Sequence, residues 1–260
     1  MNRLTRSLAL AALIFSYSAI SEGRASAQAG EGPRPGTSPL HAHAARVLST
    51  RHVTFADAAD LADRLQSDPA LSGSLELRGR SILLWIRAMR RALDGIPLTA
   101  ARNAEPYRTW LARHASDLVY SEPAGQWLIA PDLIWALHDD ARSSGAAGDI
   151  AWEAVDNGLP GECEGYPPCY LSGLTRLHGR YLQAYPDGPR APQAVQAIAA
   201  SLEQIDRLLA APGGQEFFNP ATDCDDLRKT AAELLEQLGG APAAAGVRAA
   251  VRALLSRCAG

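Results

Sequence analysis

Apolar side chains recur along this chain with the period of an α-helix, and this pattern limits the fold more than any other feature. Ile82, Trp85, Ile86, Met89 and Leu93 lie at offsets of 0, 3, 4, 7 and 11 residues, which places them on one face of a helix. Similar stripes recur in 107–118, 174–185, 195–209, 227–238 and 247–255. The pattern predicts an all-α protein, an irregular array of helical hairpins with eight or nine helices, and only 119–129 is compatible with a short strand.

The composition agrees with this prediction and excludes one class of function. Hydrophobic residues make up 47% of the chain, aromatic residues only 6%, and alanine, leucine and arginine are abundant, all of which favour helix. Lys229 is the only lysine, and the formal net charge is −3. A near-neutral chain of this kind is not typical of a nucleic-acid-binding protein, so no nucleic acid is expected as a partner.

Residues 1–29 have the features of a secretory signal peptide. Arg3 and Arg6 precede an apolar stretch over 7–20, and the small residues of Ala27-Gln28-Ala29 predict cleavage before Gly30. The alternative is a membrane anchor that is retained, but the apolar stretch is shorter than the roughly 20 residues needed to span a bilayer. Cleavage would change the net charge from −3 to −5. No later segment is expected to cross a membrane, so the sequence predicts a periplasmic or secreted protein.

The remainder of the chain is expected to form a flexible lead over 30–52 and one α-helical domain over 53–260. Proline and glycine are frequent in 30–40, and Thr54 with Asp57 resembles the capped start of a helix. His41 and His43 form a His-x-His pair that could bind copper or zinc. Their position in the predicted lead favours the simpler interpretation of a solvated tail.

Four cysteines predict two disulfides in an exported protein. Cys163 and Cys169 bracket a Glu-Gly-Tyr-Pro-Pro stretch that is unsuited to helix and can close as a small loop. Cys224 begins one predicted helix and Cys258 ends the next, and these ends lie side by side in an antiparallel hairpin. Of the three possible connectivities we therefore expect 163–169 with 224–258, the longer bridge contributing about 3 kcal/mol. A zinc site is the alternative, but the spacing matches no usual Cys/His pattern.

The stretch 174–202 carries a local resemblance to known proteins. Tyr181-Leu182 is followed by Tyr185-Pro186-Asp187-Gly188 and then by a helix containing Ala191, Ala194 and Ala197. This phrase resembles one helix pair of envelope tetratricopeptide-repeat-like proteins. The match covers about 30 residues, with no second copy at the repeat spacing of about 34 residues. The resemblance implies a helical scaffold that binds protein.

Three histidines define one candidate chemistry. His114, His138 and His178 each lie on or beside the apolar stripe of a predicted helix. If they converged, they could hold a metal ion with Glu153 or Asp139 as a further ligand or general base. The simpler interpretation is that each histidine makes hydrogen bonds within or at the edge of the core.

A second candidate is a recognition surface around the loop closed by Cys163 and Cys169. Its members are aromatic residues in or near the loop and the two acids beside the first cysteine: Trp152, Tyr166, Tyr170, Glu162 and Glu164, with Trp127 as a further possibility. Aromatic side chains on a rigid loop lose little entropy on binding. The alternatives are that Trp152 and Tyr170 belong to the core and that the acids are simply solvated. Asp223, Asp225 and Asp226 are assigned to the positive end of a helix dipole.

The sequence contains no phosphate-binding glycine loop, nucleophile elbow or Ser/Lys motif, so no cofactor is expected. The leading hypothesis is an exported, non-enzymatic helical protein that binds a protein or another cell-envelope component. The alternative is a metal-dependent or acid/base hydrolase that uses His114, His138, His178 and Glu153.

Overall fold

Capping side chains and prolines set the starts of many helices. The computed structural model describes residues 38–158, 163–239, 241 and 244–258. Thr54 and Ser74 accept hydrogen bonds from amides of the first turns that follow them, and Pro131, Pro167 and Pro220 occupy first-turn positions. The helices are α1 (Pro39–Ser49), α2 (Phe55–Gln66), α3 (Leu75–Asp94), α4 (Tyr107–Arg113), α5 (Pro131–Asp140), α6 (Ala147–Asp156), α7 (Pro167–Leu174), α8 (Arg180–Ala184), α9 (Ala191–Ala210), α10 (Pro220–Leu238) and α11 (Ala245–Leu255).

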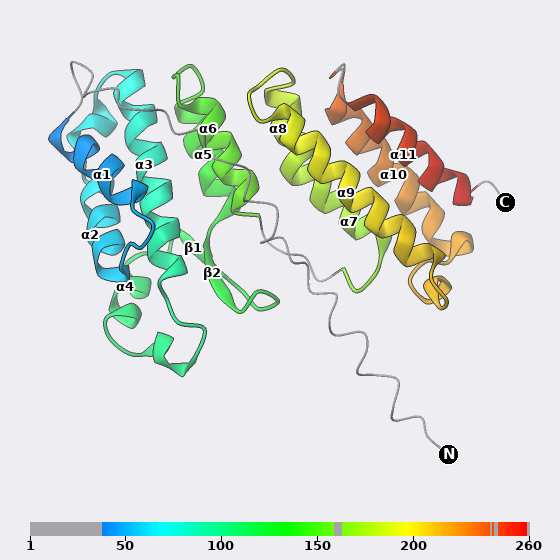
Figure 1. Ribbon diagram of the computed structural model, residues 1–260, viewed down its shortest axis with the longest axis horizontal. Helices are drawn as coiled ribbons and strands as arrows, with labels where there is room; N and C mark the ends of the chain where they lie inside the picture. Colours follow the sequence, from blue (N-terminus) through cyan, green and yellow to red (C-terminus); the bar gives the residue numbers. More distant parts are fainter. Residues whose placement is uncertain (1–37, 159–162, 240, 242–243, 259–260) are drawn as a thin grey trace. The chain divides into compact units, whose positions relative to one another are not determined.

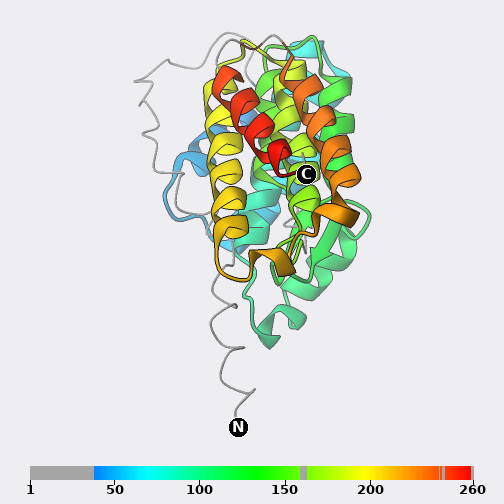
Figure 2. The same ribbon diagram turned by 90° about the vertical axis from the view of Figure 1, so that its right-hand side faces the viewer.

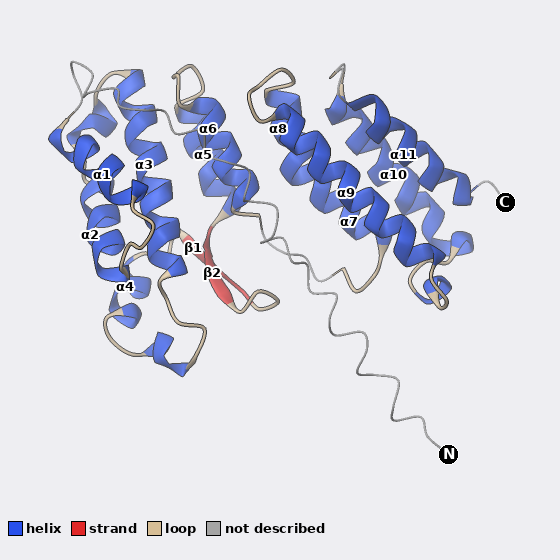
Figure 3. Ribbon diagram, in the orientation of Figure 1, coloured by secondary structure: helices blue, strands red, loops and turns tan. Residues whose placement is uncertain are grey.

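The all-α prediction is confirmed (Figure 3). A π-helical turn, Thr175–Gly179, joins α7 to α8 without a break, so the described residues form ten continuous α-helical segments rather than eight or nine. The described residues also form short 3-10 helices and one antiparallel hairpin, β1 (Leu118–Ser121) with β2 (Gln126–Ile129), in the region that is compatible with a short strand. No helix of the described part is both long and apolar enough to cross a membrane.

The first helices pack as antiparallel neighbours (Figure 1). Helix α2 lies along α3, whose buried face carries the predicted stripe from Ile82 to Leu93. Helices α5 and α6 form a second pair, and α6 also contacts α3. The β-hairpin is tied to α6 because the Asn157 amide donates to the carbonyl of Ile129 (2.7 Å) and accepts from its N–H (3.3 Å).

Helix α1 corrects the prediction of a flexible lead that extends to residue 52. Its start has a recognisable cap, because the Ser38 hydroxyl accepts a hydrogen bond from the His41 amide and Pro39 occupies the first turn. His41 is fully buried, with Nε2 2.7 Å from both Asp68 Oδ2 and Ser81 Oγ. The assignment of His41 to a solvated tail is therefore wrong. The compact unit begins at Ser38.

The later helices carry both disulfides. Cys163 pairs with Cys169 and Cys224 with Cys258, which confirms the predicted connectivity. Helix α10 packs against α7 and α11, and α11 also packs along α9 (Figure 2). The turn of the predicted antiparallel hairpin, between α10 and α11, falls partly outside the described residues. The apolar stripes over 227–238 and 247–255 are largely buried, while Leu235 and Leu255 are half-buried. Their buried leucines and valines are Leu227, Leu234, Leu238, Val247, Val251 and Leu254.

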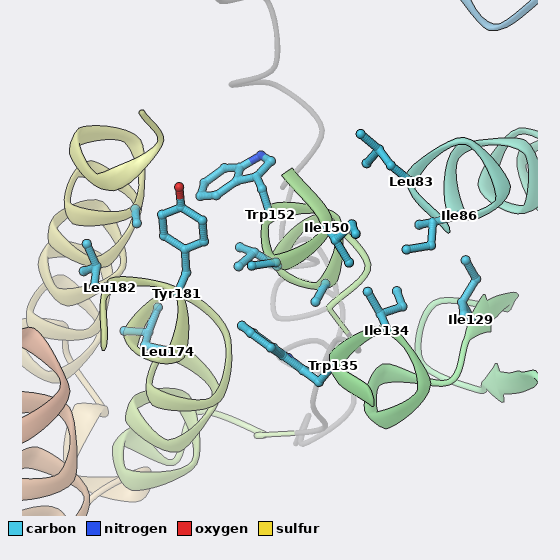
Figure 4. Close-up of a cluster of buried hydrophobic side chains, with 14 of the residues drawn as sticks. Leu83, Ile86, Ile129, Ile134, Trp135, Ile150, Trp152, Leu174, Tyr181 and Leu182 are labelled. Carbon is cyan, nitrogen blue, oxygen red and sulfur yellow. The ribbon is translucent and has the colours of Figure 1, made fainter. Parts of the chain in front are cut away.

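One apolar core runs through both sets of helices (Figure 4). Ile86 of α3 and Ile129 of β2 lie near Ile134 of α5, and Trp152 of α6 faces Tyr181 of α8. The two rings meet edge to face with centroids 5.2 Å apart, a favourable aromatic geometry. The helix pairs are thus joined by large buried rings as well as by aliphatic side chains.

Candidate functional site

The loop closed by Cys163 and Cys169 connects α6 to α7 and has a well-defined backbone. The Tyr166 N–H donates to the carbonyl of Cys163 (2.7 Å), and the Cys169 N–H donates to the carbonyl of Tyr166 (3.1 Å). Two successive residues, Glu164 (φ 46°) and Gly165 (φ 90°), are in the left-handed region. This turn reverses the chain before the two prolines that begin α7.

Two contacts fix the loop to the following parts of the fold. A Cβ on Gly165 would lie 2.2 Å from the Phe217 ring, so the ring approaches the backbone as only glycine allows. The Tyr166 hydroxyl donates a hydrogen bond to Asp226 Oδ2 of α10 (2.9 Å). The loop is therefore held by the disulfide, by the segment between α9 and α10, and by α10 itself.

Two hollows flank this loop, and we call them together the bridged-loop site. Both are lined by Tyr166 and Cys169, so these residues stand between them. The larger hollow, about 580 Å³, is completed by Cys163, Glu164, Glu216, Phe217, Phe218, Asn219 and Asp223. The smaller, about 270 Å³, is completed by Pro168, Ser172, Asp226, Lys229, Thr230 and Glu233. Both hollows are open to solvent rather than enclosed.

The site is acidic. Its carboxylates are Glu164, Glu216, Asp223, Asp226 and Glu233, and Lys229 is the only cationic side chain among the described lining residues. Among the residues that the structure describes, none of these five carboxylates forms an ion pair. Ring faces and hydrogen-bond acceptors that are not neutralised favour a positively charged ligand.

The titration of two side chains reflects this environment. Burial, the hydrogen bond to Asp226 and the negative charges of Asp226 and Asp223 raise the pKa of Tyr166 to about 12. The phenol therefore remains a hydrogen-bond donor at neutral pH. Hydrogen bonds from the Asn219 N–H and the Thr222 hydroxyl lower the pKa of Asp223, which stays ionised.

The structure brings only some of the predicted recognition residues to the site. Tyr166 and Glu164 line the site, and the Tyr170 hydroxyl supports the loop by accepting from the Gly165 N–H (3.3 Å). Trp152 is only 7% exposed and belongs to the core, so its assignment to a recognition surface is wrong. Trp127, the further possibility, lies instead in the β-hairpin against Tyr120, and Glu162 lies outside the described residues.

Sequence reasoning missed several residues that reach the site from other elements. Glu216 and Phe217 lie between α9 and α10, and Lys229 and Glu233 lie on α10. The acidic start of α10 is a local signal for the site, but the helix dipole accounts for the same residues. Nothing in the sequence places Phe217 against Gly165, because that contact joins segments about 50 residues apart.

The histidines of the metal hypothesis occupy separate environments. His114 Nε2 lies 2.7 Å from Asp63 Oδ1, and His138 Nε2 lies 2.7 Å from the Tyr185 hydroxyl. His178 is buried beside Trp152. Burial lowers the pKa of His138 and lowers that of His178 to about 4.

Glu153, the fourth member, makes contacts of its own. It accepts hydrogen bonds from Arg87 (2.7 Å) and Arg90 (2.5 Å) of α3. No group of three or more His, Cys, Asp or Glu side chains in the described residues is arranged to hold a metal ion. The four residues are thus not brought to one site.

Comparisons with family models, curated proteins and solved structures found no match to this chain.

Proposed function

We propose that this chain is an exported, non-enzymatic protein of the bacterial cell envelope that binds a protein or another envelope component through the bridged-loop site. Export is supported by the signal-like residues 1–29 together with the pairing of all four cysteines. Disulfides persist in oxidising compartments and are rare in the cytosol.

The observation that carries the proposal is the rigid placement of Tyr166 between two hollows. The Tyr166 ring is half-buried and its hydroxyl is hydrogen-bonded to Asp226. The Tyr166 backbone is held within the Cys163–Cys169 loop. A binding surface that is already ordered loses little conformational entropy when a partner docks. Aromatic residues in such positions often contribute most of the affinity of a protein interface.

A binding role also agrees with the side chains at the site. Ser172 and Thr230 line the smaller hollow, but no histidine is among the described lining residues of either hollow. The Thr230 hydroxyl donates to the backbone carbonyls of Asp226 and Leu227 rather than to a carboxylate, and a hydroxyl that no base activates is a weak nucleophile. The site offers carboxylates, ring faces and one ammonium group, which suit recognition.

The test is capture of partners from an envelope extract by the purified, oxidised protein. Ser172 lines the smaller hollow, is half-buried and makes no side-chain hydrogen bond within the described part of the chain, so Ser172→Trp should fill the hollow without unfolding the chain. Ala200→Trp, on the exposed face of α9, is the matched control. We expect quantitative mass spectrometry to show a partner that is retained by the wild-type and control proteins and lost by Ser172→Trp. Equal retention by all three proteins would refute the proposal.

A further inference from the structure

The acidic charge of the bridged-loop site lacks the arginine partners found elsewhere on the chain. Glu153 is paired with Arg87 and Arg90, and Asp206 is paired with Arg257. The chain has 24 arginines, yet none is among the described residues that line either hollow. Carboxylates left without cations at a concave surface attract positive ligands and repel negative ones.

The charge is distributed unevenly between the two hollows. The larger contains Glu164, Glu216 and Asp223 and no cationic residue among its described lining. The smaller contains Asp226 and Glu233, partly offset by Lys229. The formal charge is therefore −3 in the larger hollow and −1 in the smaller, so the larger is the stronger site for a cation.

Aromatic rings add a second attraction for the same class of ligand. Tyr166 borders both hollows and Phe217 borders the larger, and both rings are half-buried. A guanidinium or ammonium group over such a ring gains cation–π energy in addition to its attraction to carboxylates. Arginine suits this site best, because its planar guanidinium group can stack on a ring and hydrogen-bond to a carboxylate at the same time.

We propose that the bridged-loop site binds an extended, arginine-rich segment of a protein partner, with one basic side chain in each hollow. This inference rests on the proposed function and specifies the chemistry of its partner. In an extended chain, side chains two residues apart point the same way at a spacing of roughly 7 Å. The two hollows share Tyr166 and Cys169 as lining residues, so neighbouring basic side chains of one segment can enter one hollow each, whereas a small cation would occupy only one.

The test uses a fluorescent peptide of alternating glycine and arginine, with an alternating glycine–glutamate peptide as its control. Binding to the oxidised wild-type protein is followed by fluorescence anisotropy. We expect the arginine peptide to bind and the glutamate peptide not to bind. Raising NaCl from about 50 to about 500 mM should weaken binding about tenfold or more, because the attraction is largely electrostatic.

Charge variants locate the binding. Glu164→Gln with Glu216→Gln should weaken binding about fivefold or more. The control, Glu122→Gln with Asp187→Asn, neutralises two exposed acids away from the site and should leave the affinity near that of the wild type. Lys229→Gln removes the one competing cation and should tighten binding.

Several results would overturn the inference. These are equal binding of the two peptides, equal loss in the site and control variants, and binding of arginine amide as tight as that of the peptide. Weaker binding by Lys229→Gln would do the same. These outcomes are distinguishable from failure of the proposed function. If the peptide experiment fails but the capture experiment still finds a partner that Ser172→Trp loses, the binding function stands and only the arginine-rich segment is refuted.

Discussion

Burial of His178 should make the stability of this protein depend on pH. His178 lies in the π-helical turn between α7 and α8 and is only 4% exposed. Its ring centroid is 6.3 Å from that of Trp152, and Nδ1 is buried without a hydrogen-bond partner in the described structure. Burial lowers the pKa of His178 from 6.5 to about 4, because a charged imidazolium would lose its hydration.

The direction of the effect follows from the two pKa values. As the pH falls below 6.5, the unfolded chain takes up a proton on this histidine while the folded chain does not, until the pH approaches 4. His178 therefore contributes no pH dependence above about pH 7, and stability is lost progressively between 6.5 and 4. At about 1.4 kcal/mol per unit of pKa difference, the loss from this residue is about 3 kcal/mol.

Urea unfolding followed by circular dichroism at several pH values between 4 and 7 measures this loss. Wild type is compared with His178→Leu, which cannot titrate, and with the exposed-histidine control His52→Leu. Between pH 7 and pH 4 the wild type should lose about 3 kcal/mol of unfolding free energy relative to His178→Leu. The control difference should remain nearly constant. A difference for His178→Leu that does not change with pH would refute the account of a buried, neutral imidazole.

Four further predictions concern the longer disulfide, the α10–α11 packing, helix α1 and export. Replacing Cys224 and Cys258 by serine should lower the free energy of unfolding by about 2–4 kcal/mol without changing the helical circular dichroism signal at room temperature. Leu234→Ala should lower the free energy of unfolding by about 2–5 kcal/mol, because it leaves a cavity at a buried position of α10. A Leu234→Ala variant as stable as the wild type would show that α10 and α11 do not pack. His41→Ala should cost about 1–3 kcal/mol and expose α1 to proteolysis, because Asp68 loses a buried partner. Mass spectrometry of exported material should find a mature N-terminus at or near Gly30, and an intact leader would contradict export.

Local patterns determine most of the fold that could be predicted from the sequence. The apolar stripe from Ile82 to Leu93 identified α3, and the two pairs of cysteines followed from helix ends and a loop that are near in sequence. Each of these inferences needs only the helical period, a capping residue or a turn. The short strands remained ambiguous because Leu118–Ser121 and Gln126–Ile129 are too brief to show a clear alternation.

Long-range packing determines the features that differ from the sequence-based prediction. The cap at Ser38 was a local signal for α1 that the glycine- and proline-rich lead obscured, and the burial of His41 depends on Asp68 and Ser81 from other segments. Trp152 was assigned to recognition because it is near the loop in sequence, but Tyr181 covers it in the core.

The candidate site likewise contains residues that the local sequence predicts and residues that only tertiary packing places there. Tyr166 and Glu164 were found from the bridged loop itself, whereas Phe217 enters through a tertiary contact with Gly165.

The most direct measurement asks whether another molecule touches the bridged-loop site in the living cell. A photo-activated cross-linking amino acid is placed at Ser172, in the smaller hollow, and at the exposed Ala200 on α9 as the control position. After irradiation of intact cells, cross-linked peptides are identified by mass spectrometry. The account predicts one reproducible partner at position 172 that is absent at position 200. Absence of any adduct at 172, or the same adducts at both positions, would contradict it.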